Sequence, residues 1–261
     1  MKIVAIIQAR MSSRRLPGKI LETIEGTPLL AHVVHRAQAT NVFATVMVAT
    51  STDPSDDLVQ RFCASQEIPC FRGSLHDVLD RYLRAAASLN AEVITRITGD
   101  CPLLDPAVTR RVVEAFDPLH CDYVSNTVQR TFPKGLDTEV FSMRALTQAH
   151  REARLPSERE HVTPYFYKHP ELFRLAQITQ DIDRSALRWT VDEPRDLAFV
   201  RAVAEQLGDG NFGQTEILEL LQAHPHLQHI NEGIDPNEGY LRSLREDETF
   251  DRGKSDNKRA F

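Results

Sequence analysis

Short runs of β-forming residues alternate with helical patterns along the first half of the chain. The strand-like runs cover residues 2–7, 44–50, 68–72, 91–98 and 121–126, and the helical patterns between them cover residues 28–39, 54–65, 75–89 and 106–116. Parallel strands need crossover connections, which are usually helices. The alternation therefore predicts an α/β fold, a three-layer sandwich around a mostly parallel sheet.

The length and the later part of the chain suggest one main domain. The 261 residues, 41% of them hydrophobic, suffice for one sizeable core. The alternation breaks over residues 127–180, which resemble an insertion with its own small sheet, and resumes with a strand and a helix over 187–207. We predict a domain over residues 1–230 that includes the insertion, and a loosely held polar tail over 231–261.

Composition narrows the class of protein. A net charge of −6 argues against nucleic acid as the main partner. The N-terminal apolar run is too short for a signal peptide or a membrane span, so we expect no membrane association. The four cysteines show no C-x-x-C pair and resemble buried thiols of a reducing compartment. These features predict a cytoplasmic protein.

A cationic loop follows the first strand. The segment "IIQARMSSRRLPGKIL" carries Arg10, Arg14, Arg15 and Lys19 without a neutralising acid. It is neither a P-loop nor a dinucleotide fingerprint, because it lacks the glycines that both require. Arginine forks, a lysine and backbone N–H groups suit the oxygens of a triphosphate. The loop is therefore predicted to hold polyphosphate, with a solvated basic loop as the alternative.

Two carboxylates follow predicted strands. Asp100 comes directly after the strand at 91–98, and Asp192 lies just before a helix. Magnesium is commonly held by one or two carboxylates together with substrate phosphates. Each aspartate taken singly is also a candidate helix N-cap. Together with the cationic loop they predict a Mg²⁺ site at the carboxyl edge of the sheet.

Three segments resemble the signature motifs of a known family. "IIQARMSSRRLPGK", "RITGDCPLLD" and "WTVDEPRDL" are similar to motifs of the cytidylyltransferases that activate 2-keto-3-deoxy sugar acids. "FRGSLHDVLDRY", "FPKGLDTEVFS", "EREHVTPYFYKHPE" and "NEGYLRSL" resemble the spore coat polysaccharide biosynthesis protein F branch of that superfamily. The resemblance covers nearly the whole chain.

The resemblance implies a nucleotide-diphospho-sugar transferase fold, usually dimeric. It implies transfer of CMP from CTP to a sugar acid, with release of pyrophosphate, for surface polysaccharide biosynthesis. The implied nucleotide-binding residues are Ala9, Arg10, Ser12, Ser13, Arg15, Lys19, Arg72 and Thr98. Arg15, Lys19, Asp100 and Asp192 would be catalytic, and the two aspartates would ligate magnesium. The sugar would face Asp137, Glu139 and His161. The Kdo enzymes have Gln-Gly-Asp where this chain has Thr98-Gly99-Asp100, which leaves base recognition and the choice of sugar open.

Two further expectations concern the insertion. Tyr165, Phe166, Tyr167 and Phe173 are too many aromatics for a small insertion to bury alone, so we expect a homodimer through this segment. Asp137 and Glu139 alternate with Thr138 and should project to one face of a strand. Two acids there favour an amino-bearing or hydroxyl-rich sugar acid.

Two other functions remain possible from the residues. A glycosyltransferase of related fold typically binds its metal through Asp-x-Asp, and Asp100-Cys101-Pro102 lacks the second carboxylate. A non-catalytic nucleotide-binding module would need neither aspartate. Release of pyrophosphate separates both from a cytidylyltransferase.

Overall fold

The computed structural model describes residues 1–208, 212–235 and 238–259, with side chains described as far as residue 250. Within these residues a seven-stranded sheet has the order β5-β4-β1-β6-β8-β7-β9. Its strands are β1 (Ile3–Gln8), β4 (Thr45–Ser51), β5 (Cys70–Gly73), β6 (Val93–Thr98), β7 (Tyr123–Ser125), β8 (Glu139–Ser142) and β9 (Leu175–Gln177). The short strands β2 (Thr23–Ile24) and β3 (Thr27–Pro28) form a separate hairpin.

The sheet is mostly parallel, as the sequence predicts. Strand β1 runs parallel to β4 and β6, and β4 runs parallel to β5. Strand β8 is antiparallel to both β6 and β7, while β9 is parallel to β7. The expectation of a separate small sheet in residues 127–180 is wrong, because β8 and β9 of this segment extend the main sheet.

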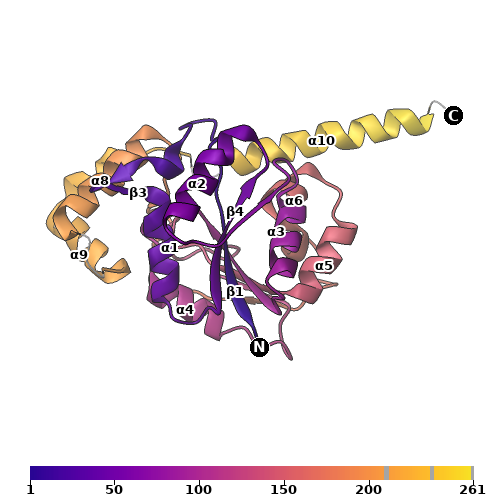
Figure 1. Cartoon of the computed structure of the whole chain (residues 1–261), viewed down its shortest axis with the longest axis horizontal. Coiled ribbons are helices and arrows are strands. Elements are labelled where there is room, and N and C mark those ends of the chain that lie inside the picture. Colours follow the sequence, from indigo (N-terminus) through magenta and orange to yellow (C-terminus); the bar gives the residue numbers. More distant parts are fainter. Residues whose placement is uncertain (209–211, 236–237, 260–261) are drawn as a thin grey trace.

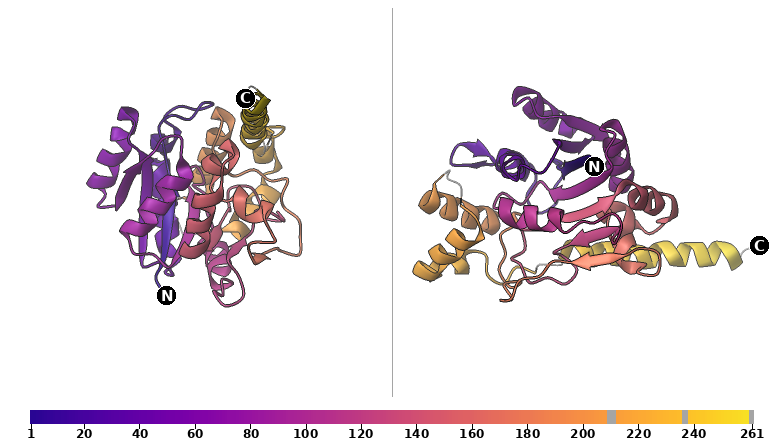
Figure 2. Two further views of the ribbon diagram at one scale, coloured as in Figure 1. Left: turned by 90° about the vertical axis from the view of Figure 1, so that its right-hand side faces the viewer. Right: turned by 90° about the horizontal axis from the view of Figure 1, so that it is seen from below.

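Helices cover both faces of the sheet (Figures 1 and 2). One face carries α1 (Leu29–Ala39), α2 (Asp57–Ser65) and α4 (Pro106–Glu114), and the other carries α3 (Val78–Ser88), α5 (Met143–Glu152) and α7 (Pro164–Lys168). Side chains of β1 alternate between the two layers: Ala5 and Ile7 join the α1 core, and Val4 and Ile6 join the α3 core. The three-layer sandwich is confirmed.

The chain from residue 187 onward departs from the predicted strand. Residues 187–192 are extended but make only an isolated bridge, between Lys134 and Arg188. Helix α8 (Pro194–Leu207) then begins with Glu193 as its N-cap, and α9 (Gln214–Ala223) packs against it. Asp192 therefore lies in the loop that leads into α8, and the N-cap of this helix is Glu193 and not Asp192.

The C-terminal segment is more ordered than the sequence predicts. After η3 (Pro225–Ile230), α10 (Glu238–Arg259) packs against α6 (Pro156–His161). Its Ser243 and Asp247 are buried. The prediction of a loosely held tail is therefore wrong for the first turns of α10, although Figures 1 and 2 show its C-terminal end projecting away from the body.

The aromatic side chains of the insertion are mostly buried in the chain's own core. Tyr165, Phe166 and Phe173 join Tyr123 and Phe141 beneath α5 and α7, with exposed fractions of 7% or less. This removes the argument that these aromatics need a partner subunit to cover them.

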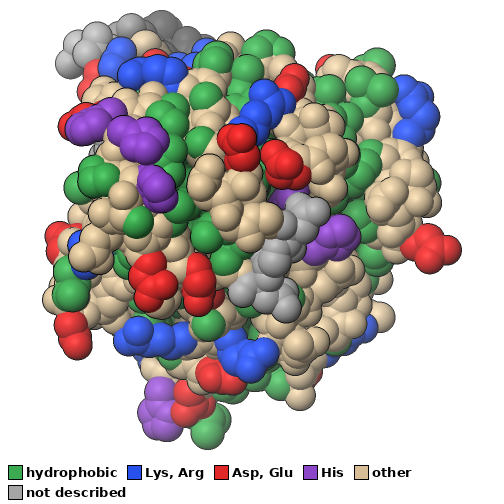
Figure 3. All heavy atoms as spheres, turned by 90° about the vertical axis from the view of Figure 1, so that its left-hand side faces the viewer, with side chains coloured by type: hydrophobic (Ala, Val, Ile, Leu, Met, Phe, Trp, Pro, Cys, Tyr) green, Lys and Arg blue, Asp and Glu red, His purple; other side chains and the backbone are tan. Residues whose placement is uncertain are grey.

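The α8–α9 side of the molecule presents a mixed surface. Figure 3 shows acidic and basic side chains interspersed there with small hydrophobic areas. Across the described residues, no helix combines the length and the apolar character that crossing a membrane requires.

Candidate active site

A cavity of about 350 Å³ opens beyond the carboxyl ends of β1 and β6. The loop after β1 contributes Ala9, Arg10, Ser13, Arg14, Arg15 and Lys19 to its wall. The loop after β6 contributes Thr98, Gly99, Asp100 and Cys101. Parallel α/β sheets typically place ligands at this edge. The structure thus brings most of the predicted site residues together in one cavity.

The ammonium group of Lys19 lies between the two predicted metal ligands. Its Nζ donates to Asp100 Oδ2 at 2.7 Å, to Asp192 Oδ1 at 2.9 Å and to the carbonyl of Val191 at 2.7 Å. Burial lowers the pKa of Lys19, but the two carboxylates outweigh burial and raise it above the ordinary value. Lys19 therefore stays charged and links Asp100 and Asp192 through its hydrogen bonds to both carboxylates.

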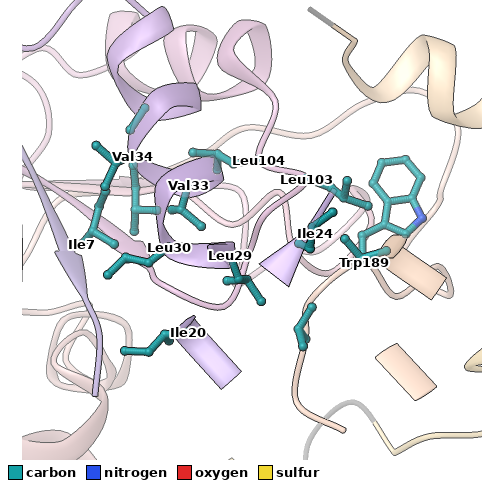
Figure 4. Close-up of a cluster of buried hydrophobic side chains, with 14 of the residues drawn as sticks. Ile7, Ile20, Ile24, Leu29, Leu30, Val33, Val34, Leu103, Leu104 and Trp189 are labelled. Carbon is teal, nitrogen blue, oxygen red and sulfur yellow. The ribbon is translucent and has the colours of Figure 1, made fainter. Parts of the chain in front are cut away.

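Hydrophobic anchors position the three loops that carry these groups. Ile20 follows Lys19, Leu103 lies three residues after Asp100, and Trp189 precedes Asp192 by three residues. All three side chains are buried in one cluster beneath α1 (Figure 4). The polar ends are therefore fixed in space because their apolar neighbours share a core.

Glycines allow the closest approaches in the site. A Cβ at Gly99 would lie 2.8 Å from the carbonyl oxygen of Gln8, so the β6 loop can touch the end of β1 only without a side chain there. Gly135 has φ +117° and lies against the backbone of Trp189. Both contacts bring catalytic candidates from distant segments to the same cavity.

Arginines hold the second oxygen of Asp192. Its Oδ2 lies 3.0 Å from Arg15 Nη2 and 2.9 Å from Arg188 Nη2. Burial raises the pKa of Asp192, but Lys19, Arg15 and Arg188 outweigh it and hold the pKa far below the ordinary value. Arg188 also pairs with the fully buried Asp196. Asp196 lies within the "WTVDEPRDL" motif and Arg188 directly precedes it, but the sequence analysis assigned a role to neither residue.

The donor set fits a divalent cation at Asp100 better than at Asp192. Asp100 Oδ1 faces only the thiol of Cys101, at 3.6 Å, among the described residues, whereas both oxygens of Asp192 are matched by cations. The described residues contain no group of three or more His, Cys, Asp or Glu side chains that could hold a metal alone. A magnesium ion here would need further oxygens from a ligand, as phosphates provide.

Asp56 anchors the cationic loop from beneath. It is fully buried, accepts the N–H of Met11 at 2.7 Å and accepts the N–H of Ser51 at 3.0 Å. The Ser51 hydroxyl also donates to it. Sequence reasoning missed this residue because it lies on a separate 3₁₀ turn, 45 residues from Met11.

Helix α3 also contributes a cation to the wall of the cavity. Val78 and Arg81 of α3 line it, and Arg81 is 1% exposed with an Nε that has no hydrogen-bond partner in the part of the chain that the structure describes. Both residues belong to the "FRGSLHDVLDRY" motif. Within it Arg81 reaches the cavity wall, a role that the motif alone did not assign.

Three predicted site residues lie elsewhere. Arg72 on β5 pairs with Asp57 and donates to the carbonyls of Ser51 and Asp53, so it braces the edge of the sheet and does not line the cavity. Ser12 is exposed and does not line it, whereas Ser13 does.

Glu139 is the third of these residues. It is 3% exposed, pairs with Arg96 on the neighbouring strand and accepts from Tyr123 Oη at 2.6 Å. It therefore supports the floor of the cavity from below.

Comparisons with known proteins identify the family. Residues 4–219 match the family model described as "Cytidylyltransferase". The chain belongs to the cytidylyltransferase family.

One relative covers most of this cytidylyltransferase, and another covers about half of it. It is 32% identical over 231 residues to the spore coat polysaccharide biosynthesis protein SpsF of Bacillus subtilis, covering 85% of this chain and 95% of SpsF. It is 37% identical over 123 residues to the 3-deoxy-manno-octulosonate cytidylyltransferase of Geobacter metallireducens, covering 47% of this chain and 46% of that protein. The branch resemblance is therefore confirmed.

Solved structures share the fold. A cytidylyltransferase from Leptospira borgpetersenii superposes with a TM-score of 0.85 at 32% identity, covering 90% of this chain and 99% of that one. A CMP:2-keto-3-deoxy-manno-octonic acid synthetase complexed with CTP superposes with a TM-score of 0.61 at 20% identity, covering 79% of this chain and 100% of that one. The second match supports the fold alone.

The remaining wall of the cytidylyltransferase cavity holds the two other predicted sugar residues. Asp137 is bound by both terminal nitrogens of Arg130, at 2.6 and 2.8 Å. Burial raises the pKa of Asp137, but Arg130 and Lys134 outweigh it and lower it below the ordinary value. His161 also lines the cavity, and burial lowers its pKa to about 4 despite the nearby carboxylate of Glu160. At neutral pH this wall therefore offers an ionised Asp137 and a neutral imidazole.

Proposed function

We propose that this protein transfers CMP from CTP to a hydroxyl of a sugar acid and releases pyrophosphate. The observation that carries the proposal is the cluster of Lys19, Asp100 and Asp192 in a cavity that Arg10 and Arg15 also line. Cations that can bind a triphosphate thus lie beside carboxylates that can bind the divalent cation accompanying it. Family membership supports the transfer of a cytidylyl group.

Positioning and charge neutralisation would be the tasks of this chain's side chains. The reaction is an in-line attack of a sugar hydroxyl on the α-phosphorus of CTP, with pyrophosphate as the leaving group. Arg10, Ser13 and Arg15 would bind phosphate oxygens, and Lys19 would offset negative charge that grows on the departing pyrophosphate. The hydrogen bonds of Asp56 would keep the loop shaped for this role.

We further propose that the enzyme uses Mg²⁺. Asp100 would hold it, joined by Asp192 when the cations now on Asp192 turn to the phosphates of CTP. When bound, magnesium neutralises phosphate charge and lowers the pKa of a coordinated hydroxyl. Asp100 supports this role because one of its oxygens faces the cavity without a cationic partner among the described residues.

Base selection would depend on backbone groups near Ala9 and on Thr98, because Arg72 does not reach the cavity. A wrong base leaves such fixed donors and acceptors unpaired, so CTP should be preferred over UTP, ATP and GTP by at least about tenfold.

The cellular setting follows from two other observations. The four cysteines are free thiols, which suits the cytoplasm. The similarity to SpsF supports a role in surface polysaccharide biosynthesis.

The test is pyrophosphate release with each of four nucleoside triphosphates and Mg²⁺. Acceptors are Kdo, sialic, pseudaminic and legionaminic acids, with several sugar phosphates as the contrasting class. The proposal expects turnover with CTP and a sugar acid. If turnover occurs only with a sugar 1-phosphate and UTP or a purine triphosphate, the proposed base and the proposed acceptor are both wrong. A glycosyltransferase acting on a nucleotide sugar would release no pyrophosphate.

A homodimer remains a prediction. It now depends on the family resemblance alone, since Tyr165, Phe166 and Phe173 are covered by the chain itself. Light scattering at micromolar concentration should give twice the chain mass of 29.6 kDa. A monomeric mass would contradict the prediction.

A further inference from the structure

The first turns of α10 form part of the cavity wall. Gly239, Tyr240 and Arg242 line it, next to His161 of α6. The ring of Tyr240 meets the His161 ring edge-on, with 5.4 Å between centroids. Glu238 pairs with Arg15 of the cationic loop at 3.1 Å, so α10 lies between that loop and α6.

Buried polar contacts fix the orientation of α10. Ser243 is fully buried and donates to Glu160 Oε2 at 2.9 Å, while its oxygen lies 2.9 Å from His161 Nε2. One turn further along, Asp247 accepts the N–H of Ser157 at 2.8 Å and its hydroxyl at 2.6 Å. These contacts place Tyr240 and Arg242 at the cavity and leave Arg245 exposed.

The direction of the Ser243 hydrogen bonds determines which ring nitrogen of His161 carries the proton. Since Ser243 donates to Glu160, its oxygen accepts the Nε2–H of the imidazole. The neutral ring then carries an acceptor at Nδ1, which suits a sugar hydroxyl.

The acids around this part of the cavity already have partners. Glu160 accepts from Ser243 and pairs with Arg10 at 3.4 Å, and Glu139 pairs with Arg96. Arg242 is different. Its side chain is 36% exposed, its Nε is buried without a hydrogen bond to any described residue, and its ion pair with Glu246 is long, at 3.8 Å. The unmatched charge here is therefore positive, and it suits an anionic group.

We propose that Arg242 and Tyr240 of α10 bind the acceptor, with the Arg242 guanidinium pairing with the carboxylate of a sugar acid. This inference rests on the proposed function and selects within it a sugar that carries a carboxylate. It also replaces the expectation that Asp137 and Glu139 present two bare acids to the sugar, because Arg130 and Arg96 neutralise them.

The experiment compares two acceptors in the full-length protein. These are the sugar acid with the highest turnover and its methyl ester, which removes the negative charge. Arg242→Ala should raise KM for the acid by at least about tenfold, because a charge-assisted hydrogen bond is lost, and should leave KM for CTP within about twofold. KM for the ester should not change. Tyr240→Ala, which removes the ring from the cavity wall, should raise KM for both acceptors. Arg245→Ala, on the exposed side of the same helix, is the matched control, and thermal unfolding checks that α10 stays docked.

Separate results would overturn the inference and the proposed function. Equal KM values for the acid in Arg242→Ala and Arg245→Ala would overturn the inference, as would a change confined to CTP. If no acceptor turns over, the proposed function fails. Calorimetric binding of Kdo in the presence of CMP then decides the inference alone: loss of binding in Arg242→Ala supports it, and absence of millimolar binding to the parent protein overturns it.

Discussion

Lys19 Nζ lies 2.7 Å from Asp100 Oδ2 and 2.9 Å from Asp192 Oδ1, so a single ammonium spans the two carboxylates of the cavity. Removing one partner of a buried charge pair leaves the other uncompensated. Lys19 thus has two tasks in the proposed reaction: it restrains the carboxylates before the substrate arrives, and it meets phosphate afterwards.

Replacing Lys19 by methionine tests this double role. Lys19→Met should lower turnover by at least about 100-fold, because a preorganised cation is lost. It should also tighten binding of Mn²⁺ in the absence of nucleotide, since no ammonium then competes for Asp100 and Asp192. Electron paramagnetic resonance of free Mn²⁺ measures the second effect. Weaker Mn²⁺ binding than in the parent protein would show that Lys19 does not compete with the metal.

Asp100→Asn tests the predicted metal ligand. An amide oxygen carries no charge, so turnover should fall by at least about 100-fold while the fold is kept. Asp181→Asn, at an exposed position outside the cavity, is the control. Activity near the parent level at saturating Mg²⁺ would remove Asp100 from the site. The same change at Asp192 requires a parallel stability measurement, because Arg15 and Arg188 lose their shared partner.

Asp56→Ala tests the anchor of the cationic loop. The N–H groups of Met11 and Ser51 would lose their acceptor, which should lower the free energy of unfolding by about 1–3 kcal/mol. KM for CTP should rise more than KM for the acceptor, because the loop that is loosened is the one proposed to hold phosphate. Denaturant titration and steady-state kinetics check the two parts. An unchanged KM for CTP would show that Asp56 contributes to stability but not to the binding of CTP.

His161 predicts a pH dependence of stability. Its pKa is about 4 in the folded chain, whereas an ordinary histidine has about 6.5. The unfolded chain therefore binds more protons between these values, so stability is lost as pH falls from about 6.5 to 4 and is unaffected above that range. Glu160, Glu139, Arg96 and Arg242 are the charged groups that act on the ring.

His161→Gln should flatten the fall in unfolding free energy over that pH window. The exposed His226→Gln serves as the matched variant. Proton NMR of the His161 ring gives an independent reading, and a midpoint near 6.5 in the folded protein would refute the assignment.

The central strands and the cationic loop could be predicted because their signals are local. Strand β1 is a run of apolar residues, Lys19 ends the cationic loop that follows it, and Asp100 comes two positions after the predicted strand 91–98. The partner of Lys19 could not be predicted, because it depends on loops that meet only after Ile20, Leu103 and Trp189 share a core. The sequence therefore predicted most of the residues that line the cavity but not which pairs form among them.

Two errors have a common physical origin. Glu139 has the alternation of a residue facing a ligand, but β8 pairs with β6 in a register that sets Arg96 opposite it. The side chains of α10 that the structure describes are mostly polar, and Ser243 and Asp247 dock the helix through hydrogen bonds. In both cases a long-range polar contact decided the outcome, and such contacts leave no periodic pattern.

The contact between Arg15 and Glu238 joins the loop after β1 to helix α10, more than 200 residues later in the sequence. During synthesis the sheet strands emerge before α10, so the sheet and its loops can form on a chain that still lacks this helix. Such a chain has the Lys19 cluster but no Tyr240 or Arg242. The wall that α10 supplies is thus made later than the phosphate loop, and a polypeptide terminated before residue 238 would retain the phosphate loop while lacking that wall of its pocket.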